Sequence, residues 1–494
     1  MGMWIIITLC GVLTHGGTGA MEDAARRVTS LRDDAPAAPI AADNATARLA
    51  DRYRAAARRI IDAALAGNDA YRKLERLCDD VGARLSGSPE LDEAIRWAVA
   101  TMRRDGQDNV HTERVMVPHW VRGAESCAMI KPRPKPLAML GLGMSVGTPP
   151  GGITAPVVVV RNEAELDAKT DEIPGKIVLF NNKMPPYDPE RGAGYGRTVR
   201  FRAGGARLAA EKGAVACLVR SVTATSLSTP HTGGMRYGDA KVKIPAAAIT
   251  VEDAGLIARL CGRGVPVVVH LAMAAKTMPD AVSANVIGEL RGRTRPEQVV
   301  VIGGHLDSWD VGQGAHDDGG GCVIAMEAIN VLRKLNLIPR RTIRVVLFTN
   351  EENGLAGGRA YAKAHADELP RHIAAIESDS GVFRPTGYSI DCVDETRERA
   401  AVEQMGDILT LLSSIGATNA EAGGSGADVG PMKDAGVVLM GHEVDGAKYF
   451  DYHHTHADTL DKVDPVELTQ NVAVLATVAY ILADMDPPIG APAR

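Results

Sequence analysis

The sequence predicts an α/β fold in which a mixed, largely parallel sheet is covered by helices and a small β-rich module is inserted into the chain. Three observations lead to this prediction. Residues 45 to 81 repeat apolar side chains at near-helical spacing, residues 118 to 282 hold short apolar runs between turns, and from residue 285 short β-branched runs alternate with long helical patterns. Such alternation is typical of a parallel sheet with helices on both faces.

Composition limits the classes of protein that the chain can be. Of its 494 residues, 45% are hydrophobic and 23% are charged, so the chain has a core and is not a disordered protein. The formal net charge of −6 argues against binding to nucleic acid, which usually requires a basic surface. Seven cysteines are scattered without a C-x-x-C pair, and we therefore expect no thiolate metal ligand.

The N-terminal residues predict export. An apolar run of ten residues, from 4 to 13, precedes Thr18-Gly19-Ala20, a small-x-small cleavage pattern. We expect a signal peptide over residues 1–20, a propeptide or flexible linker over residues 21–44, and a secreted or periplasmic protein. The run is too short to span a bilayer, and no other apolar run approaches 18 residues, so we expect no membrane span.

Three further segments follow. Residues 45–117 are expected to form a helical part of the main domain, with helices over 45–81 and 91–104. The insert is expected over residues 118–282, with two short helices among its strands. It contains no cluster of His and acidic residues, which is typical of a lid or specificity module rather than a catalytic one.

The main sheet is expected over residues 283–494. Its apolar runs lie at residues 285–290, 299–302, 342–348, 373–376 and 437–440. Helical patterns alternate with them at residues 320–335, 355–368, 397–415 and 465–485. In such sheets the ligand site lies beyond the carboxyl ends of the strands.

Clusters of His and acidic residues follow these runs or lie in nearby loops. They are His305-Leu306-Asp307, His316-Asp317-Asp318, Glu351-Glu352, Glu377-Ser378-Asp379 and the C-terminal motif His453-His454-Thr455-His456-Ala457-Asp458-Thr459. A single carboxylate after a strand usually caps the next helix, and a single His–x–Asp is usually a pair at the surface or a pair whose hydrogen bonds are satisfied. Together, however, so many acids at one edge of a sheet would repel one another unless cations neutralised them.

Oxygen and imidazole ligands without sulfur are typical of Zn²⁺, Mn²⁺ or Co²⁺. Two His and three carboxylates can hold two such ions that share one carboxylate, and a water molecule between them would have a lowered pKa. Glu351 and Glu352 leave a strand in different directions, so one can bind metal while the other accepts a proton from that water.

These motifs, in this order, resemble the co-catalytic zinc exopeptidases typified by bacterial leucyl aminopeptidases, and within them the carboxypeptidase Q group. The insert, with Ile173-Pro174-Gly175-Lys176 and Ala209-Ala210-Glu211-Lys212, resembles the protease-associated domain of those enzymes. The resemblance covers roughly residues 60–490. It implies a zinc aminopeptidase-like sheet with an inserted protease-associated domain, and two Zn²⁺ ions per chain.

The resemblance also implies a role for each residue. His305 and Asp379 would bind one zinc ion, Glu352 and His454 the other, and Asp317 would bridge them. Glu351 would be the general base. Asp307 would accept a hydrogen bond from the second ring nitrogen of His305 and so orient it. The Asp317–Asp318 peptide is expected to be cis.

The implied activity is hydrolysis of short unblocked peptides or dipeptides by a zinc-dependent exopeptidase that forms a homodimer. An aminopeptidase acting on longer peptides, a glutaminyl cyclase-like transferase and a non-catalytic receptor on the same fold remain alternatives. The oxyanion donor stays open among Tyr449, Tyr452 and His453. Anchors for the peptide termini also stay open, with Arg197, Arg200 and Arg202 for a carboxylate and Asp428 for an amine.

Overall fold

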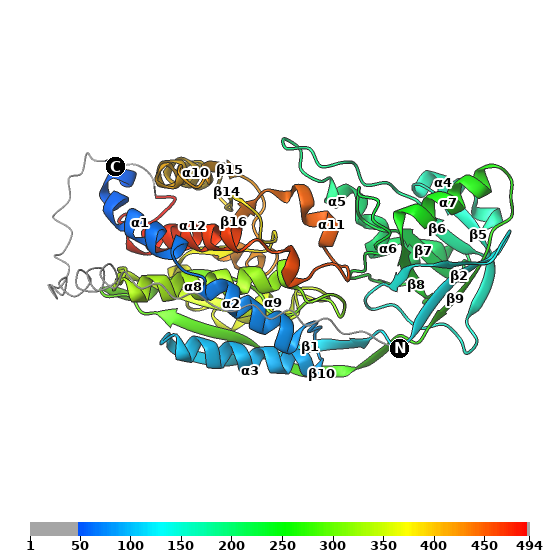
Figure 1. Cartoon of the computed structure of the whole chain (residues 1–494), viewed down its shortest axis with the longest axis horizontal. Coiled ribbons are helices and arrows are strands. Elements are labelled where there is room, and N and C mark those ends of the chain that lie inside the picture. The colour runs from blue at the N-terminus through cyan, green and yellow to red at the C-terminus, as the bar shows by residue number, and fades with distance from the viewer. Residues whose placement is uncertain (1–47, 492–494) are drawn as a thin grey trace, which may run out of the picture. The chain divides into compact units, whose positions relative to one another are not determined.

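The computed structural model describes residues 48–491, so the expected signal peptide and the expected propeptide or linker lie outside the described residues. Two sheets of eight strands each organise this part of the chain. Each sheet has its own helices, and the two groups are separate in the ribbon view (Figure 1).

The first sheet is mixed, as the sequence predicts. In spatial order its strands are β1 (Asp108–Val121), β10 (Lys276–Leu290), β12 (Arg341–Phe348), β11 (Arg295–His305), β13 (His372–Glu377), β16 (Val438–Val444), β14 (Pro385–Asp391) and β15 (Asn419–Ala422). Parallel pairing joins β12, β11, β13 and β16 at the centre. Antiparallel pairing attaches β10 on one side of this centre and β14 on the other.

Helices cover both faces of this sheet because its central strands are apolar on both sides. Along β11, Val300 and Ile302 pack into one core, and Val299 and Val301 pack into another. The first core is closed by α1 (Leu49–Leu65), α2 (Asp69–Arg76), α3 (Pro89–Arg104), α8 (Gly320–Lys334), α10 (Glu395–Leu409) and α12 (Pro465–Asp484). The second core is closed by α9 (Ala356–Ala364) and the short turn Gly430–Ala435.

Helix α12 is long and apolar enough to cross a membrane by length and composition alone. However, 83% of its apolar window is buried inside the protein. It packs against α8 and α1, beside the sheet. Its composition is therefore that of a core helix.

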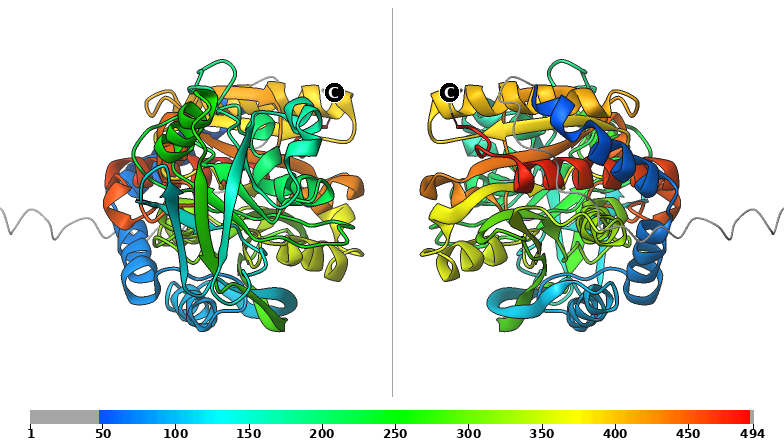
Figure 2. Two further views of the ribbon diagram at one scale, coloured as in Figure 1. Left: turned by 90° about the vertical axis from the view of Figure 1, so that its right-hand side faces the viewer. Right: turned by 90° about the vertical axis from the view of Figure 1, so that its left-hand side faces the viewer.

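The second sheet forms the insert and is β-rich, as expected. In spatial order its strands are β3 (Lys135–Leu137), β2 (Glu125–Lys131), β9 (Val268–Met273), β5 (Ile153–Val160), β6 (Ile177–Phe180), β7 (Ala216–Arg220), β8 (Ala246–Ile249) and β4 (Met139–Gly141). Helix α6 (Arg200–Glu211) covers one face and α7 (Val251–Gly262) covers the other, while α4 (Glu163–Ala168) follows β5. The left view in Figure 2 shows these strands from the side of the insert.

Strands β1 and β10 carry the chain into the insert and out of it. They pair with each other from Asp108 and Glu289 to Val121 and Lys276, so residues 118–121 and 276–282 continue strands of the first sheet. The limits of the insert expected from the sequence, 118 and 282, therefore fall within this two-stranded ribbon. They remain a prediction.

Candidate metal centre

The carboxyl ends of the parallel strands bring the expected residues together. His305 ends β11, Glu351 and Glu352 follow β12, and Asp379 follows β13. Asp317 lies in the turn Ala315–Gly319 that precedes α8, and its peptide bond to Asp318 is cis. His454 follows the short helix α11 (Tyr449–Tyr452).

Asp317 stands between two pairs of side chains. Its Oδ1 lies 3.2 Å from Nε2 of His305, and that nitrogen lies 3.5 Å from Oδ1 of Asp379. Its Oδ2 lies 3.3 Å from Nε2 of His454, and that nitrogen lies 3.1 Å from Oε2 of Glu352. The five side chains thus form two halves, and each half faces one oxygen of the shared carboxylate.

Two neighbours of these residues also have donor atoms near the centre. Among the described residues, the groups of three side chains close enough to hold an ion are His305–Asp318–Asp379, His305–Asp317–Glu352 and Asp317–His453–His454. Asp318, however, already accepts hydrogen bonds from the backbone N–H groups of His305 and Gly321, at 3.0 Å each. His453 lies farther away, with Nε2 at 3.9 Å from Oδ2 of Asp317.

The ionisable groups of the centre are buried and lie close enough to shift one another's pKa. Burial lowers the pKa of His305, but Asp379 and Asp317 raise it well above its ordinary value. Burial likewise lowers the pKa of His454, while Glu352 and Asp317 raise it to about 9. Burial and the charge of Asp317 raise the pKa of Glu352 to about 7. Carboxylates this close repel one another, so a cation among them would be stabilised.

Several donor atoms of the centre are buried without a hydrogen-bond partner. They are Nε2 of His305, Oδ2 of Asp317, Oε1 of Glu352 and Oδ1 of Asp379. Unpartnered polar atoms are costly in a folded protein and are expected where an ion binds. The donor set of nitrogen and oxygen atoms fits Zn²⁺.

Glu351 lies beside the centre and not within it. Its side chain is half-buried, and burial together with Asp379, Glu352 and Asp317 raises its pKa well above its ordinary value, although His305 opposes the shift. It lines a cleft of about 550 Å³ that residues of the insert also line. The insert contributes Arg202, Ala203, Gly234, Met235, Arg236, Tyr237, Gly238 and Lys243 to the lining of that cleft.

The structure corrects the contact expected of Asp307. Nδ1 of His305 lies 2.9 Å from the backbone carbonyl oxygen of Asp307, whereas the carboxylate is 3.8 Å away. That carboxylate instead accepts hydrogen bonds from the backbone N–H of Glu351 at 3.1 Å and from Oγ of Ser86 at 3.2 Å. The main chain therefore orients His305, and the Asp307 side chain holds the start of the Glu351 loop.

Two supporting residues were not assigned roles from the sequence. The fully buried Arg84 donates hydrogen bonds to the backbone oxygens of Leu306, Gln313 and Gly314, and so holds the chain between β11 and Asp317. Asp458 accepts from the backbone N–H of His316 and Asp317 at 2.7 and 3.2 Å. Asp458 was part of the C-terminal motif, but no local pattern distinguishes Arg84 from a surface arginine.

The insert also reaches the centre. Nδ1 of His454 lies 3.3 Å from the backbone oxygen of Thr232 and 3.3 Å from Nη1 of Arg202. The backbone N–H of Thr232 donates to the carbonyl oxygen of His454 at 3.0 Å. Residues of both sheets therefore meet at this imidazole.

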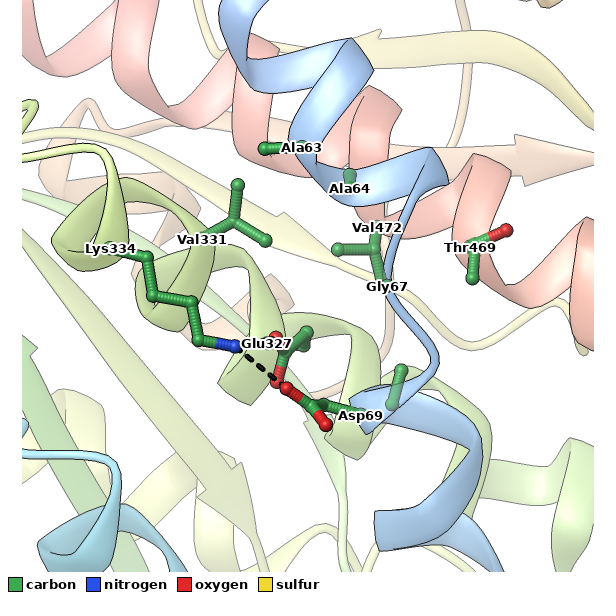
Figure 3. A pocket seen from close by; sticks show the side chains of 10 residues that line it. Ala63, Ala64, Gly67, Asp69, Glu327, Val331, Lys334, Thr469 and Val472 are labelled. Carbon is green, nitrogen blue, oxygen red and sulfur yellow. Dashed lines mark hydrogen bonds and ion pairs between the residues drawn. The ribbon is translucent and has the colours of Figure 1, made fainter. Parts of the chain in front are cut away.

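A separate small cavity lies among α1, α2, α8 and α12 (Figure 3). It has a volume of about 40 Å³ and contains an ion pair between Lys334 and Asp69 at 2.7 Å. None of the residues of the metal centre lines it. Its size suits ordered water rather than a substrate.

Comparisons with known proteins match both parts of the chain. The model of "Peptidase family M28" matches residues 285–479, and the model of the "PA domain" matches residues 153–257. Carboxypeptidase Q of Mus musculus is 45% identical over 437 residues, which is 88% of this chain and 90% of that protein.

Two solved structures are similar along most of the chain. A peptidase M28 precursor from Shewanella amazonensis SB2B has a TM-score of 0.84 and 37% identity, covering 90% of this chain and 99% of that chain. An aminopeptidase from Aneurinibacillus sp. strain AM-1 has a TM-score of 0.60 and 21% identity, covering 88% of this chain and 98% of its own, and it shares the fold.

Proposed function

The chain belongs to peptidase family M28 and is a metallo-exopeptidase, and from this membership we propose that it hydrolyses short peptides with free termini, above all dipeptides. One observation carries the proposal. The two oxygens of Asp317 face two separate pairs, His305 with Asp379 and His454 with Glu352, at 3.1 to 3.5 Å within each half. This arrangement suits two Zn²⁺ ions that share one carboxylate.

The metal ligands in this proposal are the five residues of the two halves. Zinc ions held there would lower the pKa of a water molecule and polarise the peptide carbonyl. Glu351 lines the cleft beside the ligand Glu352, and among the described residues it belongs to none of the groups of donor atoms close enough to share an ion. Its position supports a role in moving protons between water and the leaving amine.

Among the three candidates for stabilising the oxyanion, burial and the charges of nearby carboxylates favour Tyr449. Burial, Asp317, Asp379 and Glu352 all raise the pKa of Tyr449 well above its ordinary value, so its hydroxyl stays protonated and can donate. Tyr452 instead stacks on His316, with ring centroids 5.5 Å apart. His453 stacks on His454, with ring centroids 3.5 Å apart.

The cationic residues that line the cleft support the proposal of a short substrate with a free carboxylate. Arg236 and Lys243 of the insert line the same cleft as Glu351, and either cation suits a terminal carboxylate. Two anchors considered from the sequence, one for a terminal carboxylate and one for a terminal amine, do not suit their roles. Arg200 forms an ion pair with Glu163 on the surface, and Asp428, the acid considered for a terminal amine, is completely buried. The burial of Asp428 disfavours this residue as the anchor of a terminal amine.

The central test is the substitution Glu351→Gln. We expect turnover of dipeptides to fall about 10²- to 10⁴-fold, because the proton acceptor is lost while the metal ligands remain. Liquid chromatography of a dipeptide panel with free, acetylated and amidated ends measures turnover and terminal preference, and elemental analysis measures zinc. Glu403→Gln, an exposed acid on α10, is the matched control. Full activity of Glu351→Gln would overturn the assignment of the base.

The apolar run over residues 4–13 and the small-x-small pattern that ends at residue 20 support export, and the resemblance supports a homodimer. Sequencing the N-terminus of the mature protein tests cleavage after residue 20. Light scattering of the purified protein tests the dimer. A mature chain that begins at Met1, or a monomer at all concentrations, would contradict these two proposals.

A further inference from the structure

We infer that the insert is a structural part of one half of the metal centre: the backbone oxygen of Thr232 accepts from Nδ1 of His454 and keeps Nε2 turned toward Asp317 and Glu352, and Arg202 packs behind the segment that carries Thr232. The inference rests on the proposed function, because it takes His454 as a zinc ligand. Thr232 and Arg202 are positioning residues in this inference, since they act through His454.

The main chain of His454 needs external support. His454 has a φ of 60°, a left-handed conformation that is uncommon for a residue with a side chain. The backbone N–H of Thr232 donates to its carbonyl oxygen at 3.0 Å. An extended segment of the insert therefore holds the peptide that carries the ligand in place.

The side chain of His454 is supported at its other nitrogen. An imidazole that binds metal through Nε2 carries its hydrogen on Nδ1, and this N–H requires an acceptor. The backbone oxygen of Thr232, at 3.3 Å, is that acceptor. The same residue of the insert thus contacts both the main chain and the ring of His454.

Arg202 holds this segment of the insert in place. Its side chain is 7% exposed, and Nη1 lies 3.3 Å from Nδ1 of His454, which is a packing contact and not a hydrogen bond because both nitrogens carry hydrogen. Nη2 donates to the hydroxyl of Tyr195 at 2.6 Å, and the Tyr195 ring stacks on Phe450. The guanidinium also packs on Gly233, where an added Cβ would lie 2.4 Å from Cζ. Arg202 therefore fills the space behind the segment that supports His454.

Thr232 is also tied, through Arg122, to the loop that follows β11. Its Oγ1 donates to the carbonyl oxygen of Gly141 at 2.7 Å and accepts from Nη2 of Arg122 at 3.3 Å. Arg122 in turn donates from Nε to Oδ2 of Asp310 at 2.9 Å, in the loop that follows β11. These contacts fix the position of Thr232 relative to the catalytic sheet.

Among the contacts of the described residues, His305 receives no such support from the insert. Its Nδ1 lies 2.9 Å from the carbonyl oxygen of Asp307, two residues along its own loop. The inference therefore predicts unequal effects. A change at Arg202 weakens the ion bound by His454 and Glu352, and spares the ion bound by His305 and Asp379.

The test is a titration of metal-free protein with Zn²⁺ against a competing chelating dye. The wild type is expected to bind two ions. Arg202→Gln is expected to bind one ion with unchanged affinity and the other about 10- to 100-fold more weakly, the usual effect of losing support behind a metal ligand. Arg200→Gln is the matched control, because Arg200 lies on the same helix but pairs with Glu163 at the surface. It is expected to bind both ions as the wild type does.

A milder variant covers the case in which Arg202→Gln does not fold. Tyr195→Phe removes the hydroxyl that accepts from Arg202 and keeps the ring on Phe450. It is expected to weaken the same ion by a smaller factor. Unchanged binding of both ions in these variants, or equal weakening of both, would overturn the inference. A wild type that binds fewer than two ions would instead overturn the proposed function.

Discussion

Asp458 supports the metal centre through the main chain. Its two carboxylate oxygens accept hydrogen bonds from the backbone N–H groups of Ala315, His316 and Asp317 at 3.1, 2.7 and 3.2 Å. Three successive N–H groups are thus held by one side chain, and this fixes the direction from which Asp317 enters the centre. Burial raises the pKa of Asp458 to about 7, although these hydrogen bonds oppose the shift.

We expect Asp458→Asn to lower the free energy of unfolding by about 1–3 kcal/mol. The amide nitrogen of Asn cannot accept, so at least one buried N–H loses its partner. Denaturant unfolding at pH 8 measures the change. Asp461→Asn is the control, because that side chain is 69% exposed in the same loop. Equal stability of the Asp458 variant and the wild type would show that the three hydrogen bonds do not hold the turn.

His372 is a buried titratable group at the start of β13. Its Nδ1 lies 3.1 Å from the carbonyl oxygen of Glu368, and its Nε2 lies 2.9 Å from the hydroxyl of Tyr361. These partners suit a neutral ring that donates from Nδ1 and accepts at Nε2. Burial lowers the pKa of His372 to about 4.

This shift predicts a loss of stability in acid. Between pH 6.5 and about 4 the unfolded chain binds a proton at His372 and the folded chain does not, so the free energy of unfolding falls as pH falls through that window. The full contribution is about 3 kcal/mol. In His372→Gln we expect a smaller loss between pH 7 and pH 5 than in the wild type, measured by denaturant unfolding. His111→Gln, with a side chain 40% exposed, is the control. An identical pH dependence in all three proteins would contradict the prediction.

At the scale of the residue, the sequence indicates which side chains gather but not how each one points. The chemistry of His305, Asp317 and Glu352 follows from donor type and from their place after strands. The direction of the Asp307 carboxylate does not, because it depends on Ser86 and on the backbone of Glu351, far away in the chain. Arg84 acts through carbonyl groups, which every residue has, so its own sequence context contains no signal.

Helix α8 begins in close contact with the catalytic edge of the sheet. A Cβ added at Gly321 would lie 1.8 Å from the carbonyl oxygen of Ser378, which follows β13. The backbone N–H of Gly321 also donates to Oδ1 of Asp318 at 3.0 Å. The helix can approach the strand end this closely only because this position has no side chain.

We expect Gly321→Ala to destabilise the protein by about 1–3 kcal/mol, since the helix must move away from the strand end. Thermal unfolding measures the change. Gly262→Ala is the matched control, because that helical glycine in α7 has open space around its Cβ position. It is expected to be neutral or slightly stabilising. Similar melting temperatures for the two variants would contradict the close approach.

At the scale of the element, periodicity predicted the elements that are strongly apolar. The runs at 299–302, 342–348 and 373–376 lie within β11, β12 and β13, and the pattern over 465–485 matches α12. Strands β14 and β15 were not predicted. Their sequences, Pro385–Asp391 and Asn419–Ala422, mix polar residues and glycine with few apolar ones. They are strands because they pair with β16 and with each other at the sheet edge.

At the scale of the whole molecule, the metal centre makes the free energy of unfolding depend on pH and on bound zinc. Burial and neighbouring carboxylates raise the pKa of Glu352 and of Glu377 to about 7. Carboxyl groups of an unfolded chain titrate near pH 4. Between pH 4 and 7 these two carboxyl groups therefore bind more protons in the folded metal-free protein than in the unfolded chain, and their contribution to the free energy of unfolding falls as pH rises.

Zinc reverses this trend because its ligands must be deprotonated. We expect the difference in melting temperature between the zinc-bound and chelated protein to grow from pH 5 to pH 8. At zinc 100-fold above its dissociation constant, one site adds about 2.7 kcal/mol. Differential scanning fluorimetry with EDTA and with added zinc measures the difference. A difference in melting temperature that is zero, or that shrinks as pH rises, would contradict zinc binding at the proposed metal centre.

The sequence by itself determined the fold class, the positions along the chain of the strands that His and acidic residues follow, and the chemical type of the metal-donor atoms. These features are local, since apolar periodicity and residue type can be read within a few turns of chain. Only the tertiary structure decided that Asp428 is buried, that the Asp307 carboxylate holds the Glu351 loop, and that Thr232 and Arg202 of the insert contact His454. Such contacts join residues more than 200 positions apart for His454, and their geometry depends on how two sheets pack together, which no local pattern encodes.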